Sequence, residues 1–199
     1  MVDIVLASKS ETRIRLLGNA GLDVLAVPPR LDEEGLRAAF LHERTAPRDI
    51  ADALAEAKAR KVSSRVNTEH LVLGCDQILA IGDQIVIKSD CRDRAAETLL
   101  KLSGRTHQLF SAAVICQDGA PIWQHVATAR LTMRNLDQKD IDTYLDRCWP
   151  QVASSVGCYQ IENEGIRLFE RLEGSFFAIL GLPLEQVVGF LIGRGDLAP

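Results

Sequence analysis

Apolar residues fall into two patterns along this chain. Some form short, nearly continuous apolar runs, which are typical of buried strands, and others recur every three or four positions, which is typical of amphipathic helices. The runs predict strands over residues 2–7, 71–81, 84–88, 108–116, 122–132 and 166–172. The helical spacing predicts helices that follow Ser10, cover residues 49–62, 93–102 and 137–146, and begin at Pro183.

The turns between these segments indicate the fold class. Gly82-Asp83 and Asp118-Gly119 each join two strands and predict antiparallel hairpins. The element order therefore predicts a mixed α/β protein, with an elongated twisted sheet flanked by helices. Its 199 residues suit one domain spanning residues 1–199. Two lobes around a cleft are compatible with this order, although the pattern alone does not require them.

Composition and charge limit the kinds of ligand that the chain is expected to bind. The chain is 47% hydrophobic and 25% charged, with a net charge of −4. This balance is ordinary for a globular protein and gives no broad electrostatic attraction for nucleic acid. A polyanionic ligand would therefore need a local cluster of basic groups.

The apolar runs and the cysteines indicate the cellular compartment of the protein. No apolar run approaches the roughly 18 residues that span a bilayer, and the first residues lack the basic region of a signal peptide. The five cysteines are scattered and form no C-x-x-C pair, which favours reduced thiols over a zinc site or disulfides. We therefore expect a cytoplasmic protein without a membrane partner.

Asp76 is the most prominent candidate for chemistry. It lies inside the apolar run 71–81, where a carboxylate loses hydration unless a cation or hydrogen-bond donors compensate it. Such a group is a candidate general base or metal ligand. The alternative is a strand-end carboxylate that caps a neighbouring loop, and the strand context does not decide between them.

Lys88 follows the predicted hairpin. With a two-residue turn at Gly82-Asp83, Lys88 would lie opposite Gln77, and a one-residue bulge would move it to the side of Asp76. The pattern therefore supports proximity of Lys88 to Asp76 but does not decide whether the two side chains share a face of the sheet. An exposed lysine at the strand end is an equally good interpretation.

Ser8, Ser10 and Arg13 surround the start of the first predicted helix. Free N–H groups, hydroxyls and a guanidinium at such a position favour a phosphate. Taken alone, N-capping by Ser10 beside a surface arginine is the simpler interpretation. Glu33, in an acidic loop, and Lys58, on a helix with Arg60 and Lys61, are each explained by solvent exposure when considered singly.

Several other chemistries lack their motifs. The histidines show neither i,i+4 pairing nor an H-E-x-x-H context, and the chain has no P-loop or dinucleotide-binding glycine motif. Cys75 lies in an apolar strand, where a cysteine behaves as a small inert hydrophobe more often than as a nucleophile.

Taken together, the motifs resemble the Maf family of nucleotide pyrophosphatases over nearly the whole chain. Their order and spacing are specific, although each fragment alone is weak. The matching segments are Leu6-Ala7-Ser8-Lys9-Ser10-Glu11-Thr12-Arg13, Asp32-Glu33, Ala55-Glu56-Ala57-Lys58-Ala59, Gly74-Cys75-Asp76, Lys88, Leu102-Ser103-Gly104-Arg105-Thr106-His107, Gly157-Cys158-Tyr159 and Gly181-Leu182-Pro183-Leu184.

The resemblance implies a nucleoside triphosphate substrate, a divalent cation (Mg²⁺ or Mn²⁺), a two-lobed fold and a homodimer. It makes Asp76 the proton acceptor for an attacking water. It makes Glu33 a ligand of the cation or the water, and Asp76 a second metal ligand. The triphosphate would contact Ser8, Arg13, Lys58 and Lys88, and fixed cations would stabilise the charge on the leaving pyrophosphate.

Two departures from the family pattern bear on affinity and activity. The usual P-R-R reads Glu11-Thr12-Arg13, so one arginine is absent and an acid stands near the expected phosphate site. Ser89 replaces the usual proline after Lys88. These changes raise a rival hypothesis, a nucleotide-binding regulator of cell division or septum formation with little turnover.

Substrate choice depends on three further positions. Gln77 and Glu162, with the segment from Leu168 to Gly174, are more similar to the branch acting on 7-methyl-GTP, CTP or UTP than to the dTTP/UTP branch. Thr12 matches neither branch. A carboxylate at Glu162 would accept a base N–H or face a cationic methylated guanine, so we expect Thr12, Gln77 and Glu162 to contact the substrate.

Overall fold

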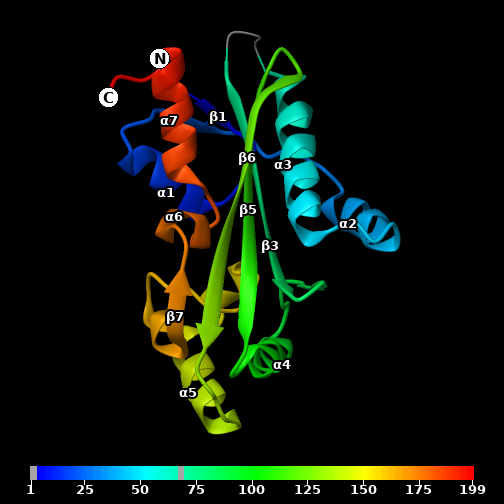
Figure 1. The fold of residues 1–199 in the computed structure, drawn as a ribbon, viewed down its shortest axis with the longest axis vertical. Helices are drawn as coiled ribbons and strands as arrows, with labels where there is room; N and C mark the ends of the chain where they lie inside the picture. Colours follow the sequence, from blue (N-terminus) through cyan, green and yellow to red (C-terminus); the bar gives the residue numbers. More distant parts are fainter. Residues whose placement is uncertain (1–3, 67–69) are drawn as a thin grey trace.

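One mixed seven-stranded sheet forms the centre of the molecule (Figure 1). The computed structural model describes residues 4–66 and 70–199, so the first two residues of the strand predicted at 2–7 lie outside the described part. The sheet order is β2-β1-β3-β5-β6-β7, and β4 pairs with β3 beside this path. The strands are β1 (Ile4–Leu6), β2 (Val24–Ala26), β3 (Val72–Ile81), β4 (Gln84–Val86), β5 (Thr106–Gln117), β6 (Ala120–Met133) and β7 (Phe169–Glu173).

Parallel and antiparallel pairing divide the sheet. β1 pairs in parallel with β2 and β3, whereas all other pairs are antiparallel. The long strands β3, β5 and β6 run along the length of the molecule and join its two ends (Figure 1). The predicted mixed α/β fold with an elongated sheet is therefore confirmed, as are both hairpins.

The helices pack on the sheet as two groups. At one end α1 and α7 cover one face and α3 covers the other, while α4 and α5 lie at the opposite end (Figure 1). The longer helices are α1 (Glu11–Asn19), α2 (Glu33–His42), α3 (Pro47–Ser63), α4 (Arg92–Leu102), α5 (Gln138–Cys148) and α7 (Leu184–Arg194), and α6 (Phe176–Ile179) is a single turn.

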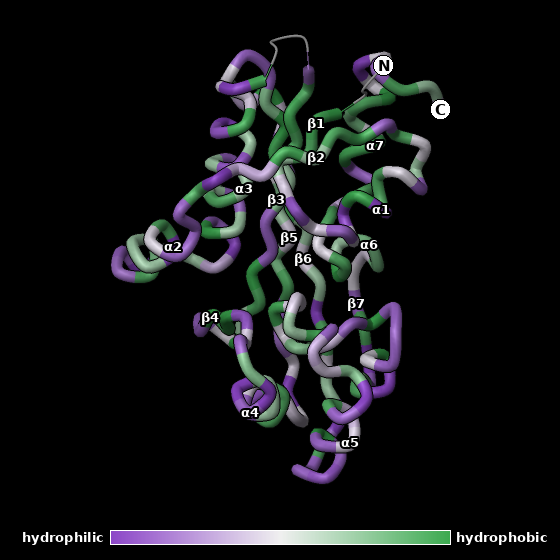
Figure 2. The backbone as a smooth tube through the Cα atoms, turned by 180° about the vertical axis from the view of Figure 1, so that it is seen from behind, coloured by the Kyte–Doolittle hydropathy of each residue, from purple (hydrophilic) through white to green (hydrophobic). Residues whose placement is uncertain are grey.

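Separate hydrophobic clusters form the core of each end. Leu17 and Val187 pack with Ile115 on the α1 and α7 face, and Leu54 packs with Val114 under α3. The cluster at the opposite end is built from α4, α5 and β7. The tube is hydrophobic along β1 and β2 and hydrophilic over much of α5, while the long strands are mixed (Figure 2). The separate clusters at the two ends correspond to two lobes that share one sheet.

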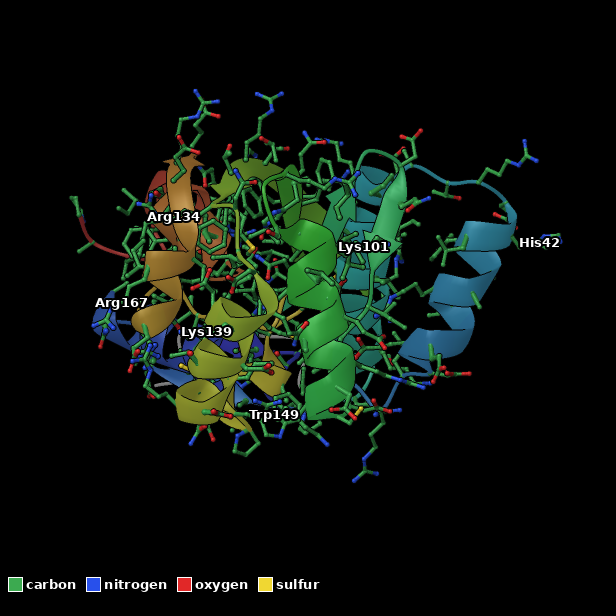
Figure 3. All side chains as sticks on the ribbon, turned by 90° about the horizontal axis from the view of Figure 1, so that it is seen from below. His42, Lys101, Arg134, Lys139, Trp149 and Arg167 are labelled. Carbon is green, nitrogen blue, oxygen red and sulfur yellow. The ribbon has the colours of Figure 1, made fainter. Side chains whose placement is uncertain are left out.

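Helix α2 differs from the other long helices because none of its residues is buried. It projects from the side of the molecule, with His42 at its outer end (Figure 3). Only Leu36 and Phe40 pack against the cluster under α3. In the described part of the chain, no helix has the length and apolarity needed to cross a membrane.

Some predicted boundaries were wrong. The strand predicted at 166–172 is a 3-10 helix over Glu164–Leu168 followed by β7. The strand predicted at 84–88 ends at Val86. α2 and the single-turn α6 were not predicted, because short amphipathic segments give a weak periodic signal.

Gly74 determines how closely β3 approaches α3. A Cβ atom on Gly74 would lie 2.1 Å from the Ala55 carbonyl oxygen and 2.6 Å from the Ala59 nitrogen. The backbones of strand and helix are therefore in direct contact, and both alanines are fully buried. Since Lys58 lies between these two alanines, this contact also fixes the position of Lys58 over β3.

We expect Gly74→Ala to destabilise the fold by about 1–3 kcal/mol, because the added methyl overlaps backbone atoms that a rotamer change cannot move. Thermal or urea unfolding would measure the loss. Gly189→Ala is a matched control: Gly189 is exposed in the middle of α7, with nothing within 4 Å of its added Cβ. That change should stabilise the protein by about 0.5–1 kcal/mol, and equal effects of the two substitutions would contradict the packing argument.

Candidate active site

A lysine ammonium between two carboxylates forms the centre of the site. Asp76 lies in β3 opposite Ala112 of β5, and it is only 5% exposed. The Lys58 Nζ atom lies 2.5 Å from Asp76 Oδ1 and 2.7 Å from Glu33 Oε2. The buried charge of Asp76 is thereby compensated, which settles the question left open by the sequence: the side chain is compensated by a cation and does not cap a loop.

Glu33 reaches Lys58 from the first turn of α2. The sequence had suggested an acidic loop here, but Asp32 is the N-cap of α2 and its Oδ1 accepts from the Gly35 N–H at 3.0 Å. Carboxylates favour this end of a helix because they complement its dipole. The sequence signal for this helix was Asp32 as an N-cap, followed by apolar Leu36 and Phe40 at helical spacing.

One oxygen of Asp76 has no partner. Oδ1 binds Lys58, whereas Oδ2 is buried and makes no hydrogen bond to any described residue. A buried unpaired acceptor is costly unless a ligand, water or cation completes it. Asp76 Oδ2 is therefore the atom of the cluster that is available to a reacting group.

The start of α1 combines capping with anchoring. Ser10 is the N-cap, and its Oγ accepts from the Arg13 N–H at 3.4 Å, as predicted. The Arg13 side chain donates from Nε to the Gly181 carbonyl at 2.9 Å and from NH1 to the Cys75 carbonyl at 3.0 Å. Its NH1 also lies 3.5 Å from Ser8 Oγ. Arg13 is thus fixed beside the residue preceding Asp76 and is not a free surface arginine.

Lys88 belongs to the same electrostatic cluster although it lies beyond the end of β4. The β3–β4 pairs keep the register of a two-residue turn, so no bulge brings Lys88 toward Asp76. The pKa of its ammonium is lowered by desolvation and then by the nearby Arg13, while Asp76 opposes this shift. Lys58 lowers the same pKa and Glu33 raises it. Lys88 itself is exposed, as the alternative interpretation expected, and these interactions place it within electrostatic range of all four groups.

Gln77 points to the opposite face of β3. Its Nε2 donates to Ser111 Oγ at 2.9 Å and to the Ala178 and Ile179 carbonyls at 3.1 and 3.0 Å. The Ser111 hydroxyl also donates to Ala178 at 2.6 Å. Gln77 and Ser111 together satisfy the carbonyls at the end of α6, so the amide nitrogen of Gln77 is already engaged.

The other two substrate candidates lie on or beside α1. Glu162 Oε1 is 3.9 Å from Arg15 NH2, and Thr12 lies in the first turn of α1. The structure therefore assembles Ser8, Arg13, Glu33, Lys58, Asp76 and Lys88 into one cluster. The substrate contacts of Thr12, Gln77 and Glu162 stay predictions.

A cleft of about 260 Å³ opens beside this cluster. It lies where the chain leaves the carboxyl ends of parallel strands β1 and β2, a common ligand position in open α/β sheets. Its lining residues are Ala7, Ser8, Lys9, Pro28, Pro29, Arg30, Leu31, Glu33 and Lys58. The contribution of Lys9 and Arg30 was missed, because Lys9 stands at a variable position of the first motif and Arg30 belongs to no motif.

Cys75 adjoins Asp76 but is not suited to nucleophilic chemistry. Burial raises the pKa of its thiol to about 11, so it stays protonated at neutral pH. This agrees with its interpretation as a small apolar core residue. The site thus combines a buried carboxylate with several cations and a polar cleft, a combination suited to an anionic ligand and proton transfer from water.

The sequence profile of the Maf-like protein family matches residues 3–193, and the chain belongs to this family. Over its full length the chain is 50% identical to the whole of "Nucleoside triphosphate pyrophosphatase 1" of Jannaschia sp. (strain CCS1). It is 51% identical to "7-methyl-GTP pyrophosphatase" of Mesorhizobium japonicum, covering 98% of this chain and 97% of the relative. "Nucleoside triphosphate pyrophosphatase" of Ruegeria pomeroyi is 44% identical over the same shares. The resemblance read from the motifs is thereby confirmed.

We expect Arg13→Lys to lower stability by about 1–3 kcal/mol, because an ammonium does not reproduce the forked donation to the Gly181 and Cys75 carbonyls. Thermal unfolding would measure the loss. Arg15→Lys on the same helix keeps its charge at an exposed position and should change stability by less than about 0.5 kcal/mol. A similar, small effect of both substitutions would contradict an anchoring role for Arg13.

Proposed function

We propose that this protein hydrolyses the α–β phosphoanhydride of nucleoside triphosphates, releasing a monophosphate and pyrophosphate. Its substrates would be non-canonical, modified or pyrimidine nucleotides that it removes from the nucleotide pool. The observation that carries the proposal is the buried Asp76, which has one unpaired oxygen and is held by Lys58, a residue that also lines the polar cleft. The names of the relatives, which are triphosphate pyrophosphatases, agree with it.

In the proposed reaction Asp76 acts as a general base. Lys58 occupies Oδ1, so Oδ2 is the oxygen that accepts a proton from water. The water oxygen bonds to the α-phosphorus, and the bond from that phosphorus to the bridging oxygen breaks. The bonding electrons leave with the pyrophosphate. Proton acceptance by a positioned carboxylate contributes about 10²–10⁴-fold to such a rate.

The surrounding cations stabilise the charge that develops on the phosphates. Lys58, Arg13 and Lys88 approach Asp76 from three different parts of the chain. Because Arg13 is held by backbone carbonyls and Lys58 by two carboxylates, these two cations need little reorganisation as negative charge builds on the leaving group. The Ser8 hydroxyl, beside Arg13, would donate to a phosphate oxygen.

The two carboxylates also fit a divalent cation. Oxygen donors suit Mg²⁺ or Mn²⁺, and Asp76 Oδ2 is a buried oxygen without a partner. Across residues 4–66 and 70–199, no group of three or more His, Cys, Asp or Glu residues is placed to hold a metal. Glu33 and Asp76 would therefore share the cation with water and phosphate oxygens. When bound, it would neutralise charge on the phosphates.

The preferred substrates would be those of the family branch that acts on 7-methyl-GTP, CTP or UTP. One relative carries the name 7-methyl-GTP pyrophosphatase, and Glu162 is the proposed contact with the base. The homodimeric state and the cytoplasmic location of the enzyme stay predictions from the family resemblance.

The first test is pyrophosphate release from a panel of nucleoside triphosphates with Mg²⁺. We expect turnover, and we expect Asp76→Asn to lower kcat at least about a hundredfold, because the amide keeps the shape but not the basicity. Asp83→Asn, in the exposed turn after β3, is the matched control and should leave kcat unchanged.

An unchanged kcat in Asp76→Asn would remove this residue from the mechanism. If no nucleotide were hydrolysed while calorimetry still detected binding, the rival hypothesis of a nucleotide-binding regulator would replace the proposal.

Glu162→Gln tests the specificity assignment. The substitution removes a negative charge that would attract a cationic methylated guanine, so the ratio of kcat/KM between 7-methyl-GTP and UTP should fall. A change of about tenfold corresponds to 1.4 kcal/mol of differential binding. Steady-state kinetics on both nucleotides gives this ratio, and equal losses for both would contradict the assignment.

A further inference from the structure

Two cations line the cleft without a role in the reaction described above. Lys9 follows Ser8 after β1, and Arg30 lies in the segment between β2 and α2. They border the same cleft as Lys58 and Glu33. Lys58 is held by carboxylates, but none of the ion pairs among the described residues involves Lys9 or Arg30. The cleft therefore presents uncompensated positive charge, although the whole chain carries a net charge of −4.

The backbone of Arg30 is in an unfavourable conformation. Its φ is +49°, in the left-handed region that side chains other than glycine rarely adopt. Arg44, with φ +56°, directly follows the C-cap of α2, and Asp118, with φ +53°, starts the turn between β5 and β6, so both have local reasons for this conformation. Cys158, with φ +58°, is the other such residue in the described part of the chain. Arg30 lies at neither a helix end nor a hairpin turn. Strain of this kind is retained where the surrounding structure or a function requires it.

The segment that carries Arg30 is restrained on its N-terminal side. Pro28 and Pro29 have fixed φ angles, and Arg65 NH1 donates to the Pro29 carbonyl at 3.4 Å from the turn after α3. The strained residue is therefore held at the cleft by its neighbours and does not belong to a freely moving loop.

The position of Arg30 matters because of the sequence of α1. The family pattern places an arginine at position 12, where this chain has Thr12 preceded by Glu11. Some positive charge expected at the phosphate site is thus absent from α1. Arg30 and Lys9 supply positive charge to the same cleft from outside that helix.

We infer that Arg30, assisted by Lys9, binds the pyrophosphate portion of the triphosphate and replaces the missing arginine of α1. This inference rests on the proposed function. In this role Arg30 offers a planar fork of donors to phosphate oxygens from a residue that lines the cleft. Asp76, Lys58 and Lys88 act at the anhydride bond that breaks.

Kinetics of Arg30 variants test this role. Arg30→Gln should raise KM for a triphosphate at least about tenfold, as expected when a charged hydrogen bond is lost, with kcat changed less than about threefold. Arg30→Lys should recover part of that affinity because it keeps the charge. Arg44→Gln is the matched control, since Arg44 is an exposed arginine with a similar φ outside the cleft.

Arg30→Gly separates backbone strain from charge. Glycine adopts a positive φ without penalty, so this variant should unfold at a higher temperature than the parent while showing the same rise in KM. A rise in KM accompanied by a lower unfolding temperature in both Arg30→Gly and Arg30→Gln would indicate a structural role and would overturn the inference.

Calorimetry with inorganic tripolyphosphate tests binding without turnover. The parent protein should bind it, and Arg30→Gln should weaken binding at least about tenfold. Equal affinities, or no binding by the parent, would overturn the inference. If Arg30→Gln weakened binding while no nucleotide was hydrolysed by the parent, the phosphate site would stand and the proposed hydrolysis would fail.

Discussion

The site depends on compensation of the buried charge of Asp76 by Lys58. A carboxylate at 5% exposure would lose most of its hydration without recovering it. The Lys58 ammonium, itself 6% exposed, restores the balance and is shared with Glu33. The pair requires strand β3 and helix α3 to be very close, which is possible because Gly74 has no side chain at the contact. Charge compensation and backbone packing are therefore two aspects of one arrangement.

The part of the site around Arg13 is assembled from segments far apart in the sequence. Arg13 of α1 donates to the carbonyl before Asp76 and to that of Gly181, which precedes α7. The end of α6, just before Gly181, is in turn held by Gln77 and Ser111. Arg13 therefore has one orientation as long as this turn keeps its place, and the first and last helices of the fold both contribute to it.

Much of this arrangement could be predicted from the sequence. The continuous apolar run singled out Asp76 as a candidate without deciding how its charge is compensated, and the N-cap at Ser10 followed from local chemistry. The motifs then grouped Asp76 with Glu33, Lys58 and Lys88. These inferences succeed because burial and capping leave local signals in the sequence.

Other features depend on tertiary contacts and leave no such signal. The carbonyl partners of Arg13 lie 62 and 168 positions away. The hydrogen bonds of Gln77 to the end of α6 also leave no local signal, and its substrate contact stays a prediction. α2 was missed because the acidic run at its start was interpreted as a solvated loop. Arg30 was missed because a positive φ at an arginine cannot be read from residue type.

The adjacent side chains of Asp76 and Gln77 also have a consequence for folding. β3 is apolar on both faces, so its hydrophobic pattern alone specifies the pairing with β5 only weakly. A one-residue slip would turn the carboxylate toward the α6 carbonyls and the Ser111 oxygen, and would remove the anion from the Lys58 ammonium. Misaligned pairing is thus penalised electrostatically on both sides of the strand. The polar pair selects the correct alignment of a strand that hydrophobicity would leave ambiguous.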